Sequence, residues 1–455
     1  MAGTLVELHS RIPGSGDSTI DNAFNNNPEP RLTRTEFSLP PVDSGKDAWL
    51  FLAACWVVEA VTFGFGMSFG VFQNYYSHTK PFAGSGNIAA IGTTTVGVLY
   101  IATPLVVSVC RLFPRYARWF TLLGLLIASM ALVSSSFCTS VSQLIITQGI
   151  MFGLGGCIAY CPCTLYIDEW FIKRKGMAYG IVWSAAGFGG TVLPLMIEAM
   201  LAKLDFKMTT QACAGVLFAT AAPLSFLVKP RLPVASNPYT RPFSMRFVKS
   251  RVFIFYQLAN VVEATGYFLP SVYLPTYAST TLGAAGFLPS LTIILLNLAT
   301  TLGLVIMGTL SDNLPVTSCM LLSAVGTATS VLLIWGLATS LPVLYVFCVA
   351  YGLFAGSWAS IWPGIMREMA GQGDGDSDRR CEYADPVMVQ GHLCVGRGVG
   401  NIISGPLSAT LIHGMPWKGK VIGGFGSGYG GLIVYTAVTA LMSGANFFAE
   451  SMKLL

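Results

Sequence analysis

Twelve long apolar runs constrain this chain more than any other feature of its sequence. Each run is about long enough to cross the roughly 30 Å hydrocarbon core of a bilayer as an α-helix. A helix satisfies its own backbone hydrogen bonds, which a lipid environment demands. The runs cover 48–75, 88–109, 119–137, 141–166, 177–200, 211–228, 252–276, 287–309, 316–337, 341–365, 387–413 and 429–448. We therefore predict an all-α polytopic membrane protein with twelve transmembrane helices.

The composition agrees with this class. Of the 455 residues, 53% are hydrophobic and only 10% are charged, whereas a soluble domain carries about 25% charged residues. The net charge of +5 does not indicate a nucleic-acid partner, because the basic residues stand singly or in short groups between the apolar runs. Basic residues in such loops report the orientation of the helices.

The distribution of Lys and Arg over alternate loops predicts that orientation. With the N-terminus inside, the inner segments hold 20 Lys and Arg residues and the outer loops hold 5. This bias predicts that both termini are cytosolic. We predict a multi-pass protein of the plasma membrane, with a vacuolar or other internal membrane as the alternative. Residues 1–47 are polar and rich in Ser, Asn, Pro and Gly, so we interpret them as a disordered cytosolic tail.

A basic segment divides the runs into two groups of six. Residues 229–251 form this predicted cytosolic linker, between an N-terminal six-helix half at 48–228 and a C-terminal six-helix half at 252–455. Two such halves are typical of transporters with parallel repeats, in which the binding site lies near the bilayer midplane. A second loop, 367–385, is acidic and glycine-rich, and we assign it flexibility but no chemistry.

Arg397 is the most informative polar residue, because it stands near the middle of an apolar run. At about 1.5 Å per helical residue it lies roughly 15 Å from the start of the run. A cation at this depth costs at least about 2.5–3.5 kcal/mol, so it requires a cavity or a partner. Gln390, Asn401, Ser404 and Ser408 share its helical face. This polar stripe predicts a site for an anionic group.

Two carboxylates lie at a similar depth in equivalent helices, Glu59 in the first run and Glu263 in the seventh. Burial disfavours the charged form of a carboxylate unless a cation is near, so both are candidates for proton coupling. The alternative is a structural ion pair with Arg397 that fastens the halves. Asn260 and Tyr267 share a helical face with Glu263, and Asn297 is the polar group of the eighth run. We predict that the substrate contacts Arg397, Asn401, Gln390, Asn260, Tyr267 and Asn297.

A charged turn follows the fourth run. Asp168 and Glu169 precede Lys173, Arg174 and Lys175. Opposite charges at this spacing could lock the inward-facing ends of neighbouring helices, and the alternative is that they only set the topology.

Several classes are excluded by what the sequence lacks. There is no Gly-x4-Gly-Lys-Ser/Thr loop for ATP, and the four histidines are dispersed, so neither an ATP-driven pump nor an enzyme is expected. Most of the 11 cysteines fall in or beside apolar runs, where a small buried hydrophobe is the usual role. We expect no metal, no cofactor and no disulfide framework.

Four stretches resemble the fungal monocarboxylate-porter branch of the major facilitator superfamily. They are Ser-Phe-Gly-Val-Phe-Gln-Asn-Tyr-Tyr at 68–76, the glycine-rich stretch at 148–160, Asp-Glu-Trp-Phe-Ile-Lys-Arg-Lys-Gly-Met-Ala-Tyr-Gly at 168–180, and Gly-Thr-Leu-Ser-Asp at 308–312. The resemblance covers roughly 48–450, and the stretch at 168–180 is its most specific part. It implies a twelve-helix fold with rocking halves. It also implies substrates that are small organic anions or, in many fungal relatives, vitamins and secondary metabolites.

The sequence also departs from that branch. The opening acidic motif is reduced to Asp47-Ala48-Trp49, and Gly303-Leu304 stands where animal members carry a substrate-binding arginine. The antiporter pattern of the fifth run is incomplete, with Leu193 in place of a glycine. These differences argue against transport of the lactate type.

We therefore predict a secondary active transporter that works by alternating access and exports a small organic anion or secondary metabolite. Its partners would be that substrate, the bilayer and a coupling proton, and the protein would be a monomer. Two alternatives stay open: a proton-coupled uptake permease for a monocarboxylate or vitamin, and a transporter-like membrane sensor.

Overall fold

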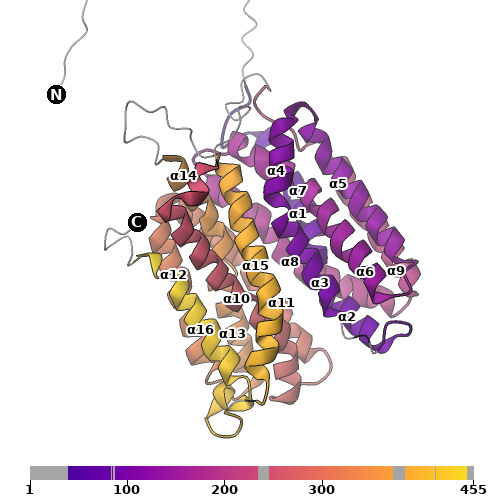
Figure 1. The fold of residues 1–455 in the computed structure, drawn as a ribbon, viewed down its shortest axis with the longest axis vertical. Helices are drawn as coiled ribbons and strands as arrows, with labels where there is room; N and C mark the ends of the chain where they lie inside the picture. The colour runs from indigo at the N-terminus through magenta and orange to yellow at the C-terminus, as the bar shows by residue number, and fades with distance from the viewer. Residues whose placement is uncertain are drawn as a thin grey trace, which may run out of the picture. The chain divides into compact units, whose positions relative to one another are not determined.

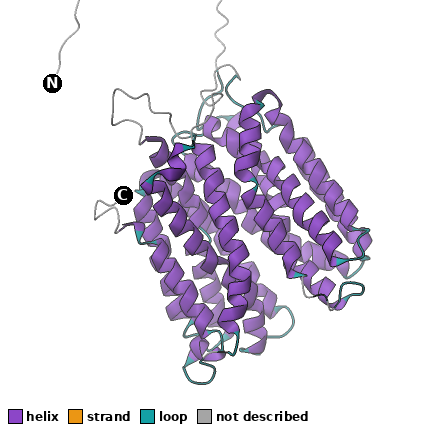
Figure 2. Cartoon of the chain, in the orientation of Figure 1, coloured by secondary structure: helices purple, strands orange, loops and turns teal. Residues whose placement is uncertain are grey.

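The computed structural model describes residues 39–83, 85, 88–233, 245–371, 385–415 and 417–447. Residues 40–455 form one compact unit, which contains the site. Much of the predicted tail, the middle of the predicted linker and the acidic loop lie outside the described residues, at 1–38, 234–244 and 372–384. The described part is helical, without strands (Figure 2).

The helices before the linker are called the first helix set. They are α1 (Lys46–Met67), α2 (Phe69–His78), α3 (Ala89–Ile101), α4 (Thr103–Leu112), α5 (Pro114–Ser135), α6 (Val141–Leu144), α7 (Phe152–Trp170), α8 (Lys175–Leu201) and α9 (Phe206–Ser225). A π-helical turn at Ile145–Met151 joins α6 to α7.

The helices after the linker are called the second helix set. They are α10 (Arg251–Thr280), α11 (Leu288–Asn313), α12 (Val316–Thr329), α13 (Leu341–Phe354), α14 (Trp362–Gly371), α15 (Pro386–Ile412) and α16 (Gly430–Ser443). A π-helical turn at Ser330–Trp335 extends α12, and a 3₁₀ turn at Trp358–Ile361 leads into α14 (Figure 1).

Each of the twelve predicted runs overlaps a helical segment, with boundaries that differ by a few residues. The first run is longer than predicted, because α1 begins at Lys46 and continues after a break at Ser68 into α2. The last is shorter, since α16 has 14 residues. By length and composition, nine segments of the described residues could cross a membrane. The helix α15 is 27 residues long but is not among them, because its polar stripe lowers its mean hydropathy.

The two sets pack together through glycines where α8 meets α11. A methyl group on Gly176 would lie 2.4 Å from the carbonyl oxygen of Gly308, so only glycine permits this approach. A continuous apolar cluster joins Leu304, Trp362 and Leu393 of the second set to core residues of the first set. A separate apolar cluster lies within the second set, from Leu269 to Ala437. The helices that carry Glu59, Glu263 and Arg397 therefore lie inside one packed bundle.

Candidate functional site

Arg397 and Glu263 form a buried ion pair inside the second helix set. Nη1 of Arg397 lies 2.9 Å from Oε2 of Glu263, and both side chains are less than one-tenth exposed. Arg397 is the twelfth residue of α15, and Glu263 is the thirteenth of α10. Both helices begin at the same end of the bundle, so the equal register brings the two groups to one depth. The charge of Arg397 is thus neutralised by Glu263, and this ion pair lies within the second set and does not join the two sets.

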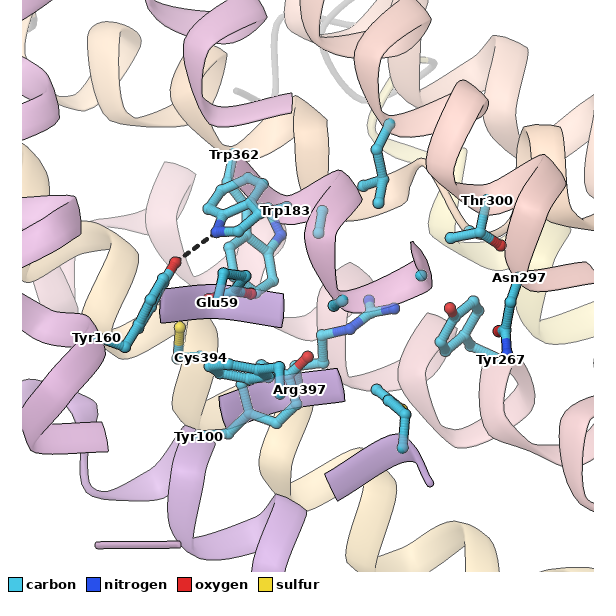
Figure 3. Close-up of a pocket in the computed structure, with 17 residues that line it drawn as sticks. Glu59, Tyr100, Tyr160, Trp183, Tyr267, Asn297, Thr300, Trp362, Cys394 and Arg397 are labelled. Atoms are coloured by element: carbon cyan, nitrogen blue, oxygen red, sulfur yellow. Dashed lines mark hydrogen bonds between the residues drawn. The ribbon is translucent and has the colours of Figure 1, made fainter. Parts of the chain in front are cut away.

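Aromatic rings hold the guanidinium of Arg397 from a second direction. Its Cζ atom lies 4.4 Å from the ring centroid of Tyr267 and 5.6 Å from that of Phe268. Figure 3 shows the guanidinium directed toward Tyr267. Cation–π contact of this kind stabilises a desolvated cation by about 2 kcal/mol. Arg397 is therefore fixed by one carboxylate and one ring face.

A cavity of about 80 Å³, called the central cavity, lies between the two helix sets. This volume is smaller than the roughly 300–1,000 Å³ of sites that hold a small molecule, so in this conformation it admits only a few water molecules. Its walls come from α1, α3, α7 and α8 of the first set and from α10, α11, the α13–α14 region and α15 of the second. The lining residues are Glu59, Phe63, Met67, Tyr100, Tyr160, Trp183, Ala186, Gly187, Tyr267, Asn297, Thr300, Leu304, Gly356, Ala359, Trp362, Cys394 and Arg397 (Figure 3).

Glu59 lines this cavity but has no counter-charge. It is the fourteenth residue of α1 and is only 2% exposed. Its Oε2 atom is buried without a hydrogen-bond partner, and none of the ion pairs among the described residues includes it. An unpaired charge in such a place is costly, whereas the neutral acid is tolerated. The arrangement suits a group that takes up and releases a proton.

Six aromatic residues form most of the remaining wall of the central cavity, namely Phe63, Tyr100, Tyr160, Trp183, Tyr267 and Trp362. The indole N–H of Trp183 donates to the hydroxyl of Tyr160, the contact drawn as a dashed line in Figure 3. The ring of Trp183 meets that of Trp362 edge to face, with centroids 5.5 Å apart. Nε1 of Trp362 is buried without a partner. The wall therefore offers flat apolar faces together with unpartnered polar groups, the Trp362 N–H and the Thr300 hydroxyl.

The predicted substrate-contacting residues divide into two groups. Arg397, Tyr267 and Asn297 line the central cavity, and the Asn297 amide also donates to the carbonyl of Gly190 across the two sets at 3.0 Å. The others are not among its lining residues. Gln390 lies 3.5 Å from the Tyr160 hydroxyl, the Asn260 amide donates to the carbonyl of Leu393, and Asn401 is buried with its amide nitrogen unpartnered.

The charged turn after α7 has partners within itself, at the start of the linker and in the segment before α1. Lys175 pairs with Asp168 at 2.8 Å, so this pair joins α7 to α8 within the first set. Glu169 accepts the backbone N–H groups of Arg231 and Leu232. Lys173 and Arg174 are exposed, and their backbone N–H groups donate to the carboxylate of Asp43. Among the described residues, the ion pair of Lys175 with Asp168 thus lies within the first set.

Two further sets of contacts at this end join the two helix sets, and neither was predicted from the sequence. Arg111 at the end of α4 forms a bidentate contact with Asp385, which precedes α15, at 2.8 and 3.0 Å. Asp312 of α11 accepts the N–H groups of Gly176 and Met177 at 2.7 and 2.9 Å. Gly176 and Met177 lie in the stretch 168–180 and Asp312 lies in the stretch 308–312, both of which carry the family resemblance, but the sequence does not indicate that these stretches meet.

Comparison with known proteins identifies the family. Residues 60–375 match the Major Facilitator Superfamily. The MFS transporter asaE of Aspergillus flavus is 26% identical over 72% of this chain and 74% of its own length. The aspyridones efflux protein apdF of Emericella nidulans is 25% identical over 91% of this chain and 80% of its own.

The agnestins efflux protein AgnL12 of Paecilomyces divaricatus is 25% identical over 79% of this chain and 81% of its own length. The human organic anion transporter MFSD10 shares the fold, with a TM-score of 0.61 over 87% of this chain and 98% of its own, at 11% identity. The monocarboxylate-porter branch stays a prediction. Because the family match covers well over half of its length, this chain belongs to the Major Facilitator Superfamily, a family of multi-pass membrane transporters and not of enzymes.

Proposed function

We propose that this transporter exports a small organic anion or an acidic secondary metabolite by alternating access. The observation that carries the proposal is the buried pair of Arg397 and Glu263 beside the central cavity. An anionic group of the cargo would replace Glu263 as the partner of Arg397, and aromatic faces would hold the rest of the molecule. The names of relatives as efflux proteins favour export.

In this proposal the two helix sets are two six-helix halves that rock about the central cavity. Arg111 with Asp385, and Asp312 with the start of α8, fasten the sets at the end where α1, α10 and α15 begin. Breaking these contacts would open that end to the cargo. The surplus of Lys and Arg at this end supports a cytosolic position for it, and we place the protein in the plasma membrane.

Proton coupling follows from the two carboxylates. When cargo occupies Arg397, Glu263 loses its counter-charge and becomes most stable as the neutral acid, so cargo binding and proton uptake are linked. Glu59, which has no counter-charge in the described structure, would carry a proton on the cavity side.

The test compares metabolites inside and outside cells of the source organism that carry the intact protein, Arg397→Ala, Arg118→Ala or no copy. Arg118 is an exposed arginine stacked on Trp119, so it controls for loss of a positive charge. Loss of a charged hydrogen bond worth about 1.5–3 kcal/mol should lower export by about tenfold or more. An acidic metabolite retained in the deletion and Arg397→Ala cells, but not in the Arg118→Ala cells, is the expected result.

The protein level of each variant is measured alongside. If Arg397→Ala cells with normal protein level export like the parent, Arg397 does not bind the cargo. If the metabolite falls inside the deletion cells instead, the protein is an uptake permease. If no metabolite changes, a sensor role gains support.

A further inference from the structure

A second cavity lies behind Glu263, on the side away from the central cavity. This rear cavity, of about 10 Å³, is lined by α10, α12, the α13 region and α16 of the second helix set. Its lining residues are Glu263, Tyr267, Ser323, Ala324, Thr327, Tyr351, Ala355, Trp358, Thr436, Ala440 and Ser443. No described residue of the first set contributes to it. It is therefore separate from the space between the two sets.

The ion pair divides the two cavities. Arg397 lines the central cavity and Glu263 lines the rear cavity, while Tyr267 lines both. Figure 3 shows Arg397 and Tyr267 from the central cavity. A cargo molecule at Arg397 and a proton at Glu263 would thus approach one ion pair from opposite sides.

Several residues around the rear cavity carry polar groups, although most of its lining surface is apolar. Besides the carboxyl group its lining includes six hydroxyl-bearing side chains, those of Tyr267, Ser323, Thr327, Tyr351, Thr436 and Ser443. Oγ1 of Thr436 is buried without a hydrogen-bond partner, and the residue is 2% exposed. The cavity has room for about one water molecule, and water occupies such spaces when two to four polar partners are available.

The lining residues lead from Glu263 to one end of the bundle. On α16, Thr436, Ala440 and Ser443 follow one another at helical spacing, and Ser443 is the last residue of that helix. Shortly beyond, the amide of Asn446 lies 3.5 Å from the carbonyl of Phe255, in the second turn of α10. The polar stripe therefore points toward the end at which α10, α12 and α15 begin.

We propose that a water molecule in the rear cavity transfers protons to and from Glu263, separately from the path of the cargo. The proposal rests on the transport function proposed above. The charged or titratable groups that face Glu263 are Arg397 on α15, Tyr267 on α10 and Tyr351 on α13; the rear-cavity residues of α12 and α16 carry none. The neutral acid gives its proton to the water, which passes a proton on toward solvent, so atoms and charge balance.

The hydroxyl groups that bind this water should then control the rate of proton exchange at Glu263. Thr436→Val removes the unpartnered hydroxyl and keeps the shape of the side chain. Thr436→Ser keeps the hydroxyl. Thr439→Val makes the same substitution one turn away, outside the lining of the rear cavity.

The experiment uses the full-length protein in lipid nanodiscs and the proton itself as the probe. Infrared difference spectra recorded at varied pH identify the carboxyl band of Glu263 as the one that disappears in Glu263→Gln. Its exchange with deuterium is then timed after transfer to D₂O. In Thr436→Val we expect exchange about tenfold slower, as for loss of one hydrogen bond in a relay, and normal exchange in Thr436→Ser and Thr439→Val.

Three results would overturn the proposal. The first is an unchanged exchange rate in a Thr436→Val protein that is folded by its thermal melt. The second is the absence of any band that depends on Glu263 at all pH values. The third is a band that responds to sodium ions and not to pH, which would make the cavity a cation site. Because no cargo is needed, a failure of the cell-export test leaves this measurement intact, and the two failures are distinguishable.

Discussion

Glu59 and Glu263 occupy corresponding positions in the two helix sets but have opposite surroundings. They are the fourteenth residue of α1 and the thirteenth of α10. Glu263 has a guanidinium 2.9 Å away, whereas Oε2 of Glu59 has no partner. The same residue type at the same depth is thus a member of a fixed ion pair in one set and an isolated acid in the other.

The corresponding helix position in the two sets thus determines where each carboxylate lies, and the neighbouring helix determines whether it has a counter-charge. The charge of Glu263 is compensated because Arg397 of α15 faces α10. Glu59 instead faces aromatic residues of α7 and α8, which offer no cation. If the comparison is correct, equal substitutions at the two sites should have unequal consequences.

The largest effect is expected when the ion pair of Arg397 and Glu263 is broken. Arg397→Met should lower the free energy of unfolding by about 3–5 kcal/mol, because it leaves Glu263 buried without a counter-charge. The double variant Arg397→Met with Glu263→Gln removes both charges and should lie within about 1 kcal/mol of the parent or above it. Unfolding by a denaturing detergent in mixed micelles measures both. An Arg397→Met protein as stable as the parent would show that the ion pair does not contribute to the stability of the fold.

A smaller effect on stability is expected from Glu-to-Gln substitutions, and its direction should differ between the two sites. Glu263→Gln should lower the free energy of unfolding by about 1–3 kcal/mol, since the amide still accepts one hydrogen bond from Arg397. Glu59→Gln should leave it unchanged within about 1 kcal/mol or raise it, because no cation loses a partner. The same unfolding assay applies. A Glu59→Gln protein as destabilised as Glu263→Gln would mean that Glu59 has a partner after all.

The sequence predicted much of this arrangement because a membrane simplifies the problem. Run lengths located the helical segments, and the polar stripe on α15 gave the depth and face of Arg397. Helical register also placed Glu59 and Glu263 at one level. All of these follow from a rise of about 1.5 Å per residue and from the cost of burying polar groups in hydrocarbon.

Contacts between helices distant in the sequence could not be predicted in this way. Periodicity shows which face of a helix is polar but not which helix that face meets. Arg397 could have met either carboxylate, and only the packing of α15 on α10 selects Glu263. For the same reason Arg111 and Asp385, 274 residues apart, gave no signal as a pair. Their charges were read only as markers of topology.

The smallest effects should separate pairs that join the two sets from pairs within one set. Asp385→Asn removes the charged contact with Arg111, which should shift the equilibrium between the closed and the open form of this end about tenfold toward the open form. Opening should speed the labelling of Cys394, a residue that lines the central cavity, by N-ethylmaleimide. Lys175→Gln breaks the pair with Asp168 inside the first set, so labelling should not change. Mass spectrometry of the peptide that contains Cys394 gives both rates. If labelling accelerates equally in the two variants, the charged turn also controls opening. If labelling accelerates in Asp385→Asn alone, the contact between the two sets controls opening.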